Sequence, residues 1–142
     1  MTMFLVGAEC IIEYQNRFLI IKRPPGKLGE GLLAFPGGTV ETKDGDEQSD
    51  ILRTAVKREV LEEVGIDLKD PVEYLTSSYF IDGKERPVVH TLFYCKLVTT
   101  SPHVTPLLSE VPEHYWMTQQ EVNQASNAPE WIKKYLTLIE ML

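Results

Sequence analysis

The sequence predicts an α/β or α+β domain in which helices pack against a mixed β-sheet. Short apolar runs of strand length alternate with two longer stretches that repeat their apolar residues at helical spacing. The chain has 142 residues, a usual size for one domain with its own core, so we expect residues 1–142 to form a single domain. Strands interleaved with helices in a chain of this size indicate layers built around a mixed sheet.

The first part of the chain is expected to form two strands followed by two loops. Residues 4–13 (FLVGAECIIE) and 17–22 (RFLIIK) are apolar runs joined by a short polar turn at 14–16. The prolines and glycines of residues 23–31 mark the first loop. The second loop opens with FPGG at 35–38, and we expect it to continue as far as Asp50.

The longest helix is expected over residues 50–64. Leu52, Val56, Val60 and Val64 recur every four residues and form one apolar row along it. Gly65 follows at the position where a helix commonly ends in a left-handed residue.

The remainder of the chain predicts a hairpin, a short strand and two further helices. Residues 72–81 (VEYLTSSYFI) and 88–98 (VVHTLFYCKLV) form the hairpin around Asp82 and Gly83, and residues 113–117 form the short strand. The small helix opens with TQQE at 118–121, a capping-box pattern, and NAPE at 127–130 repeats that pattern before the last helix. The last helix carries an apolar stripe made of Trp131, Ile132, Tyr135, Leu136 and Ile139.

Composition excludes several classes of partner. The net charge is −7 without a basic block, which disfavours binding to nucleic-acid polymers. No apolar run approaches the ~20 residues of a membrane span, and the amino-terminal stretch lacks the basic leader of a signal peptide. Cys10 and Cys95 each lie in an apolar strand-like run, so we expect two free core thiols, a reducing compartment and a cytoplasmic location.

Three glutamates lie where the long helix should disfavour them. Glu59 and Glu63 fall on the same side of the helix as Leu52 and Ala55, with Glu62 at the edge of that side. Like charges at this spacing cost roughly 0.2–0.5 kcal/mol per pair. The helix carboxyl end adds roughly 0.3–1 kcal/mol for each anion in its last turn. Since a divalent cation with oxygen ligands would remove this repulsion, we expect a Mg²⁺ site.

At this point the residues resemble a known family. The run from Arg58 to Ile66, REVLEEVGI, matches every position of the second half of the Nudix box, R-E-U-x-E-E-x-G-U, in which U is aliphatic. Phe35-Pro-Gly-Gly38 with Thr39-Val-Glu41 resembles the family's lead-in to the box, and Ala55 also fits. The resemblance implies a Nudix-type α/β/α sandwich over nearly the whole chain and the activity of a MutT-like hydrolase.

The implied activity is Mg²⁺-dependent cleavage of the pyrophosphate linkage in a nucleoside diphosphate derivative. By position, Glu59 and Glu63 resemble direct ligands of Mg²⁺ or Mn²⁺, and Glu62 a further ligand or a holder of metal-bound water. The carbonyl of Gly37 or Gly38 would complete the metal site. Arg58 would orient the carboxylates by charge-assisted hydrogen bonds. The alternative reading is a Nudix-fold sensor that binds a nucleotide without cleaving it, although such modules usually lose box glutamates.

The catalytic base remains open between three choices. A carboxylate must take the proton of the attacking water, and a box glutamate such as Glu62 or Glu63 could do so. A residue from a later loop is the second choice, and Glu110 stands where similar proteins often place it. Glu113 is the competing choice in that region. Arg23 and Lys27, just before the Pro-Gly-Gly loop, are candidates to meet the substrate phosphates.

The first half of the box departs from the family pattern G-x5-E-x7-R-E. Counting forward from Gly38 places Asp44 at the glutamate position, whereas counting back from Arg58 places Asp50 there. The loop therefore carries six extra residues, and the two aspartates compete for one role. Asp50 is also a suitable helix N-cap, which is the reading we favour. The sequence leaves open which nucleoside diphosphate derivative is the substrate and whether the protein is a homodimer.

Overall fold

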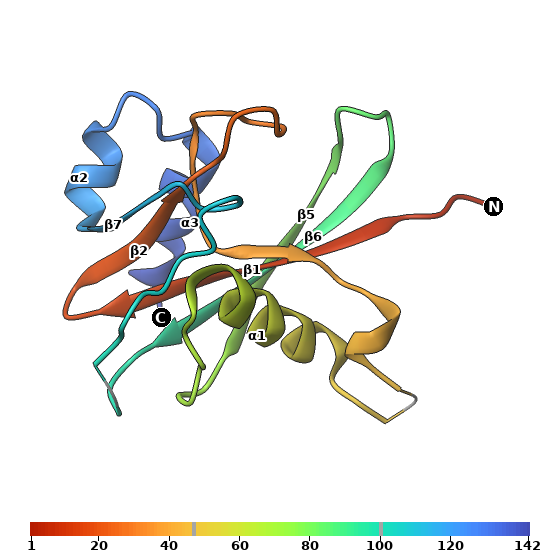
Figure 1. Cartoon of the computed structure of the whole chain (residues 1–142), viewed down its shortest axis with the longest axis horizontal. Coiled ribbons are helices and arrows are strands. Elements are labelled where there is room, and N and C mark those ends of the chain that lie inside the picture. Colours follow the sequence, from red (N-terminus) through yellow and green to blue (C-terminus); the bar gives the residue numbers. More distant parts are fainter. Residues whose placement is uncertain (47, 100) are drawn as a thin grey trace.

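The computed structural model describes residues 1–46, 48–99 and 101–142, and it has the expected mixed sheet between helices (Figure 1). Helix α1 covers one face of the sheet, whereas α2 and α3 lie on the other side. The predicted α/β/α sandwich is therefore confirmed. No helix among the described residues is long and apolar enough to cross a bilayer.

The sheet is centred on β1. The strands are β1 (Leu5–Tyr14), β2 (Arg17–Lys22), β3 (Leu33–Ala34), β4 (Gly37–Thr39), β5 (Glu73–Ile81), β6 (Pro87–Lys96) and β7 (Glu113–Met117). Strand β1 pairs in parallel with β6 and antiparallel with β2 and β4. The order runs β3-β2-β1-β6-β5, with β7 paired to β2. The turn between β1 and β2 has positive φ at both Gln15 (50°) and Asn16 (61°), the backbone that a tight hairpin prefers.

The helices are α1 (Ile51–Val64), α2 (Gln119–Gln124) and α3 (Glu130–Ile139), with a 3-10 turn at Thr42–Asp44. Asp50 caps α1 by accepting the N–H of Arg53, and Gly65 ends the helix with φ of 73°. The capping box of Thr118 and Glu121 at α2 is present as predicted.

The predicted cap of the last helix is wrong. Pro129, rather than Asn127, occupies the N-cap position of α3, and no side chain caps that end. The amide of Asn127 instead donates to the carbonyl oxygen of Gly31, 3.1 Å away, and so ties the helix entry to the first loop. In the apolar stripe, Ile132 and Leu136 are buried while Trp131 is 57% exposed.

Successive residues of β1 point into two different cores. Ala8, Cys10 and Ile12 face α1 and pack with its valines, whereas Ile11 faces α2 and α3. Cys10 and Cys95 are buried free thiols, as predicted. Burial raises the pKa of both thiols, which keeps them protonated and unreactive.

The Pro-Gly-Gly segment forms a strand, although the sequence predicts a loop there. Strand β4 pairs antiparallel with Gly7–Glu9 of β1. A side chain at Gly37 would come within 2.6 Å of the Glu9 backbone, and one at Gly38 would overlap the carboxylate of Glu59. Gly37 therefore allows β4 to pair closely with β1, and Gly38 leaves room for the carboxylate of Glu59.

Candidate active site

A cavity of about 350 Å³ lies between α1, β4 and the loop that precedes β7. Its lining consists of Gly37, Gly38, Thr39, Glu41, Glu59, Glu62, Glu63, Leu107 and Glu110. The structure thus brings all three helix glutamates to one pocket and adds two more acidic residues from other segments. A pocket lined by five glutamates in a protein of this size strongly favours a cation or a cation-bound ligand.

Glu63 is the most buried of these carboxyl groups. Its Oε1 accepts the N–H of Gly37 at 2.7 Å, so helix α1 and strand β4 are joined at this point. Burial raises the pKa of Glu63 to about 8, and the nearby charges of Glu59, Glu110 and Glu9 act in the same direction. The Gly37 hydrogen bond opposes this rise only in part. The charged form of Glu63 is therefore disfavoured by its surroundings.

Glu59 packs against the backbone of Gly38 and is largely shielded from solvent. Burial raises the pKa of Glu59, and the charges of Glu62 and Glu41 add to the effect. The guanidinium of Arg58 opposes that rise through a hydrogen bond of 2.9 Å to Glu59 Oε1. The carboxylate repulsion expected from the sequence is thus present in the fold, and Arg58 relieves part of it.

Arg58 links the glutamates to the preceding loop. Its Nη1 donates to Glu59 and to Glu62 (3.1 Å), and its Nη2 donates to the carbonyl oxygen of Thr39. Its Nε and Nη2 both donate to the buried carboxylate of Asp44. This contact lowers the pKa of Asp44. The loop and the helix are therefore held together by one bidentate ion pair.

The competition between the two aspartates has a clear outcome. Asp44 lies in the 3-10 turn and reaches Arg58, while Asp50 caps α1 and pairs with Arg53 on the surface. Asp44 thus ties the loop to the helix through Arg58, and residues 45–49 of the longer loop lie between the two aspartates. Glu47, within that insertion, lies outside the described residues.

Comparison with known proteins identifies the family of the chain. A model of the NUDIX domain matches residues 3–139. The chain belongs to the NUDIX domain family. No curated protein sequence gives a significant match to it.

Solved structures share the NUDIX fold at low sequence identity. The chain is similar to the MutT protein from Methanosarcina mazei Go1, with 20% identity, a TM-score of 0.77, and coverage of 99% of this chain and 95% of that one. It is similar to a MutT NUDIX hydrolase from Burkholderia pseudomallei, with 23% identity, a TM-score of 0.74, and coverage of 96% and 98%. It is also similar to the NUDIX domain of Shewanella oneidensis NrtR complexed with ADP ribose, with 16% identity, a TM-score of 0.75, and coverage of 96% and 88%.

The donor set of this NUDIX pocket fits a hard divalent cation. In the part of the chain that the structure describes, no three carboxylate, imidazole or thiol side chains are grouped so that they could hold a metal ion as they stand. Arg58 instead binds one oxygen of Glu59 and one of Glu62. The pocket nevertheless offers only oxygen ligands, a close backbone approach at Gly38, and carboxyl groups whose pKa values are raised by burial and by neighbouring carboxylates.

The loop before β7 brings Glu110 to the pocket. It docks on the carboxyl end of α1, where the N–H groups of Thr105 and Leu107 donate to the carbonyls of Val64 and Glu63 at 2.8 Å. These bonds satisfy carbonyls that the helix itself leaves without partners. Glu113 is not part of the pocket lining, because it lies on β7 and pairs with Lys22 at 3.0 Å.

Three lining residues, Thr39, Glu41 and Leu107, were not assigned to the site from the sequence. Thr39 and Glu41 reach the pocket because β4 pairs with β1, and Leu107 reaches it because its loop docks on α1. The position of Glu41 three residues after Gly38 could have suggested it. Of the candidate phosphate contacts, Arg23 approaches Glu9, next to Gly37, at 3.5 Å, while Lys27 is exposed in the first loop.

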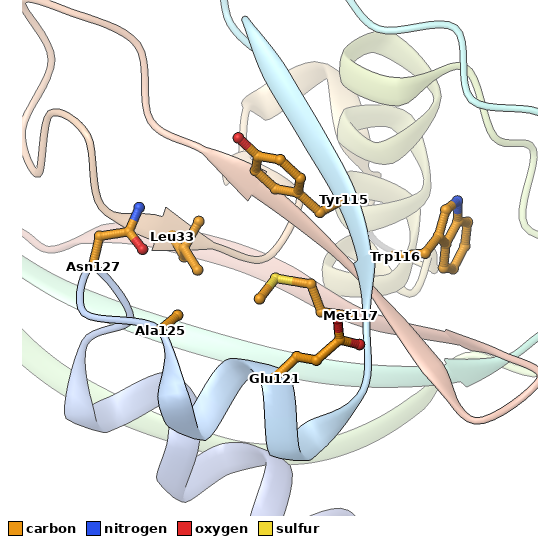
Figure 2. A pocket seen from close by; sticks show the side chains of 7 residues that line it. All are labelled: Leu33, Tyr115, Trp116, Met117, Glu121, Ala125 and Asn127. Carbon is orange, nitrogen blue, oxygen red and sulfur yellow. The ribbon is translucent and has the colours of Figure 1, made fainter.

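A second pocket of about 370 Å³ lies between β7 and α2. It is lined by Leu33, Tyr115, Trp116, Met117, Glu121, Ala125 and Asn127, of which Trp116 lies on the other side of β7 from Met117 (Figure 2). Its apolar wall with a few polar groups is typical of sites for planar organic ligands rather than for cations.

Proposed function

We propose that the protein is a Mg²⁺- or Mn²⁺-dependent NUDIX pyrophosphohydrolase that cleaves a nucleoside diphosphate derivative, such as a nucleoside triphosphate or a nucleotide sugar. The observation that carries this proposal is the single pocket in which Glu59, Glu62 and Glu63 meet Glu110. A pyrophosphate is itself anionic, so such a pocket accepts it only together with cations.

In this proposal Glu59, Glu62, Glu63 and a carbonyl of Gly37 or Gly38 hold the cation. When bound, the cation supplies neutralisation of the phosphate oxygens and activation of water. Arg58 orients Glu59 and Glu62 through its Nη1 and does not touch the substrate. Glu63 loses its proton as the positive charge arrives, since its raised pKa reflects burial among anions.

Glu110 is proposed as the base that accepts the proton of the attacking water. The water oxygen forms a bond to phosphorus, the phosphoanhydride P–O bond breaks, and the water proton passes to a carboxylate. Glu110 belongs to a loop that faces the helix glutamates across the pocket, and its exposed position leaves it free to approach a bound ligand. Glu62 and Glu63 are the alternative bases.

The remainder of the substrate is assigned to two other places. Arg23 and Lys27 are proposed to contact its phosphates, because Arg23 stands beside Glu9 and Gly37. The nucleoside is placed in the second pocket, between β7 and α2, whose apolar wall suits a flat base. The ADP ribose in the similar NUDIX domain of NrtR supports a nucleotide ligand of this size.

The test is hydrolysis of a panel of nucleoside triphosphates, nucleotide sugars, ADP-ribose and dinucleoside polyphosphates with Mg²⁺ or Mn²⁺. The products are converted to inorganic phosphate for detection, by inorganic pyrophosphatase for the triphosphates and by alkaline phosphatase for the other substrates. Glu62→Gln and Glu63→Gln should each lower kcat by at least about 100-fold on the best substrate. Glu73→Gln, an exposed glutamate on β5, should leave kcat unchanged. Equal turnover by all four proteins would refute the proposal.

The alternative is a nucleotide-binding module without hydrolysis. It is favoured if nucleotides bind tightly while no product forms with excess Mg²⁺ or Mn²⁺. The presence of all three box glutamates at one pocket supports hydrolysis instead. We further propose that residues 1–142 act as one NUDIX unit in the cytoplasm, on the grounds that two buried free thiols suit a reducing compartment.

A further inference from the structure

Strand β5 forms one edge of the sheet and exposes several large apolar side chains. It is last in the strand order and pairs with β6 on its inner side (Figure 1). Four of its aromatic and aliphatic side chains are between 41% and 60% exposed: Tyr74, Tyr79, Phe80 and Ile81. Residues 74–81 carry no charge, and residues 76–81 pair regularly with β6. Natural edge strands are usually short, charged or covered, because their free backbone groups pair readily with other strands.

The hydrogen bonds of the β5–β6 hairpin show which backbone groups of β5 face the free edge. At the tip, the N–H of Asp82 donates to the carbonyl oxygen of Arg86 at 3.0 Å, so these two residues form a hydrogen-bonded pair. Such pairs alternate with non-hydrogen-bonded pairs along an antiparallel ladder. The next pair, Ile81 with Pro87, agrees with this alternation, because proline has no N–H to donate. The backbone groups that point away from β6 therefore belong to three alternate residues: Ser77, Tyr79 and Ile81.

We propose that β5 is the docking surface for a second copy of this chain, which pairs its own β5 antiparallel along this edge. A two-fold axis at Tyr79 brings the outward-facing residues into register, since Tyr79 then lies opposite itself and Ser77 lies opposite Ile81. Each of these pairs exchanges both of its N–H···O bonds, as in an ordinary antiparallel ladder. Because each copy contributes the same edge, the assembly closes at two chains and forms one continuous sheet.

The side chains of β5 suit pairing with an identical strand. In this register a large residue lies opposite a small one on each face of the sheet. On one face Ile81 lies opposite Ser77. On the face of α3, where Ser78 meets the hydroxyl of Tyr135, Phe80 lies opposite Ser78. At the axis the two Tyr79 rings are neighbours, and aromatic cross-strand pairs stabilise sheets. Since the strand is uncharged, two chains of net charge −7 can approach at this edge.

The helices leave room for this arrangement. Helix α3 packs over β1 and β6, in the cluster that contains Ile11 and Leu92. Two β5 strands separate the β6 strands of the two copies by three strand spacings, about 14 Å. Packed helices need only about 8–10 Å between their axes, so the two α3 helices do not collide. The cation pocket lies at β4 and α1, beyond β6 and β1 from this edge, so each copy keeps its own complete pocket.

The test is sedimentation velocity of the purified chain from low micromolar to submillimolar concentration. The wild type should be a dimer at the highest concentration. Tyr79→Lys places two like charges against each other at the axis, so it should raise the Kd of the dimer at least about 100-fold. The control Leu61→Lys adds the same charge at a side chain of α1 that is 50% exposed, and it should leave the Kd within twofold. Circular dichroism checks that both variants are folded.

Two outcomes of the sedimentation experiment overturn the inference. One is a wild type that stays monomeric at every concentration, which is the result expected if the edge binds a strand of a different protein. The other is a dimer whose Kd is the same in folded Tyr79→Lys as in the wild type.

Amide hydrogen exchange of the wild type locates the interface without any variant, and so covers the case in which Tyr79→Lys does not fold. In the dimer, the N–H groups of Tyr79 and Ile81 should exchange at least about tenfold more slowly than unprotected amides, because they donate to the second copy. The N–H groups of Ser78 and Phe80 face β6 and serve as protected references within the same strand. A dimer in which Tyr79 and Ile81 exchange as unprotected amides uses another surface, and that result overturns the inference.

Discussion

Replacement of Glu63 by glutamine in the cation-free protein should remove a loss of stability that the wild type shows as the pH rises. Glu63 is buried against Gly37 and surrounded by other carboxylates, so its charged form is strongly disfavoured. Glutamine has nearly the same shape, and its side-chain oxygen can still accept the Gly37 N–H. The variant therefore isolates the cost of the charge from the packing of the side chain.

The structure sets the size and the sign of the effect. The folded-state pKa of Glu63 is about 8, against an ordinary value of 4.5. Between these values the unfolded chain has released the proton while the folded chain retains it, so the free energy of unfolding falls as pH rises. The difference between the two pKa values corresponds to a loss of at most about 5 kcal/mol in the free energy of unfolding. Because the cavity opens to water, we expect about half of that.

The assay is urea unfolding at several pH values from 5 to 8.5, with EDTA present. At pH 5 the wild type and Glu63→Gln should have free energies of unfolding within about 1 kcal/mol of each other, because Glu63 still carries its proton in the folded state. At pH 8 the variant should be more stable by about 2–3 kcal/mol. Taking the difference between the two proteins cancels the contribution of other titrating groups, such as Asp44, whose lowered pKa acts at more acidic pH.

Addition of Mg²⁺ provides an internal control. The cation should stabilise the wild type at pH 8 and have little effect on Glu63→Gln, since the variant lacks one anionic ligand. Free energies of unfolding that differ by a constant amount from pH 5 to 8.5 would refute the reasoning, because they would mean that Glu63 titrates alike in the folded and unfolded states.

Three further predictions concern the neighbouring residues. Gly38→Ala should lower the affinity for Mn²⁺ and the kcat at least tenfold, because the added methyl group overlaps the carboxylate of Glu59. The control variant Gly7→Ala adds a methyl group that meets only ordinary contacts, so it should leave the Kd for Mn²⁺ within twofold. Met117→Ala should raise KM by about 3- to 30-fold with kcat within threefold in steady-state assays, if the second pocket binds the base. Asp50→Ala should cost about 1 kcal/mol in urea unfolding through loss of the cap on α1, with no change in Mn²⁺ binding by the folded protein; a weaker Mn²⁺ Kd would contradict the separation of the two aspartates.

Much of the fold could be predicted because its signals are local. The strand pairs follow from apolar runs of strand length, and the bounds of α1 follow from Asp50 at one end and Gly65 at the other. The capping box at Thr118 was also readable, because its hydrogen bonds join residues three positions apart. The N-cap predicted from NAPE was wrong because the side chain of Asn127 donates instead to the carbonyl oxygen of Gly31, which is distant in the sequence.

The site was predictable to the extent that it lies on one helix. A helix of known period places Glu59, Glu62 and Glu63 on one side whatever surrounds it, so their grouping was determined by the sequence alone. Their positions near the carboxyl end of the helix also predicted that the helix dipole disfavours their charges.

The other components of the site depended on contacts between distant segments. Asp44 and Asp50 have the same side chain in the same loop, and only the path of the folded loop places one on Arg58 and the other on the helix end. Glu110 reaches the pocket because its loop docks on the carbonyls of α1, and Glu41 because β4 pairs with β1. The helical spacing of the glutamates was sufficient to identify the helix that carries the acidic site. The other residues of the pocket could be identified only in the folded protein, because hydrogen bonds between segments far apart in the chain leave no regular spacing in the sequence.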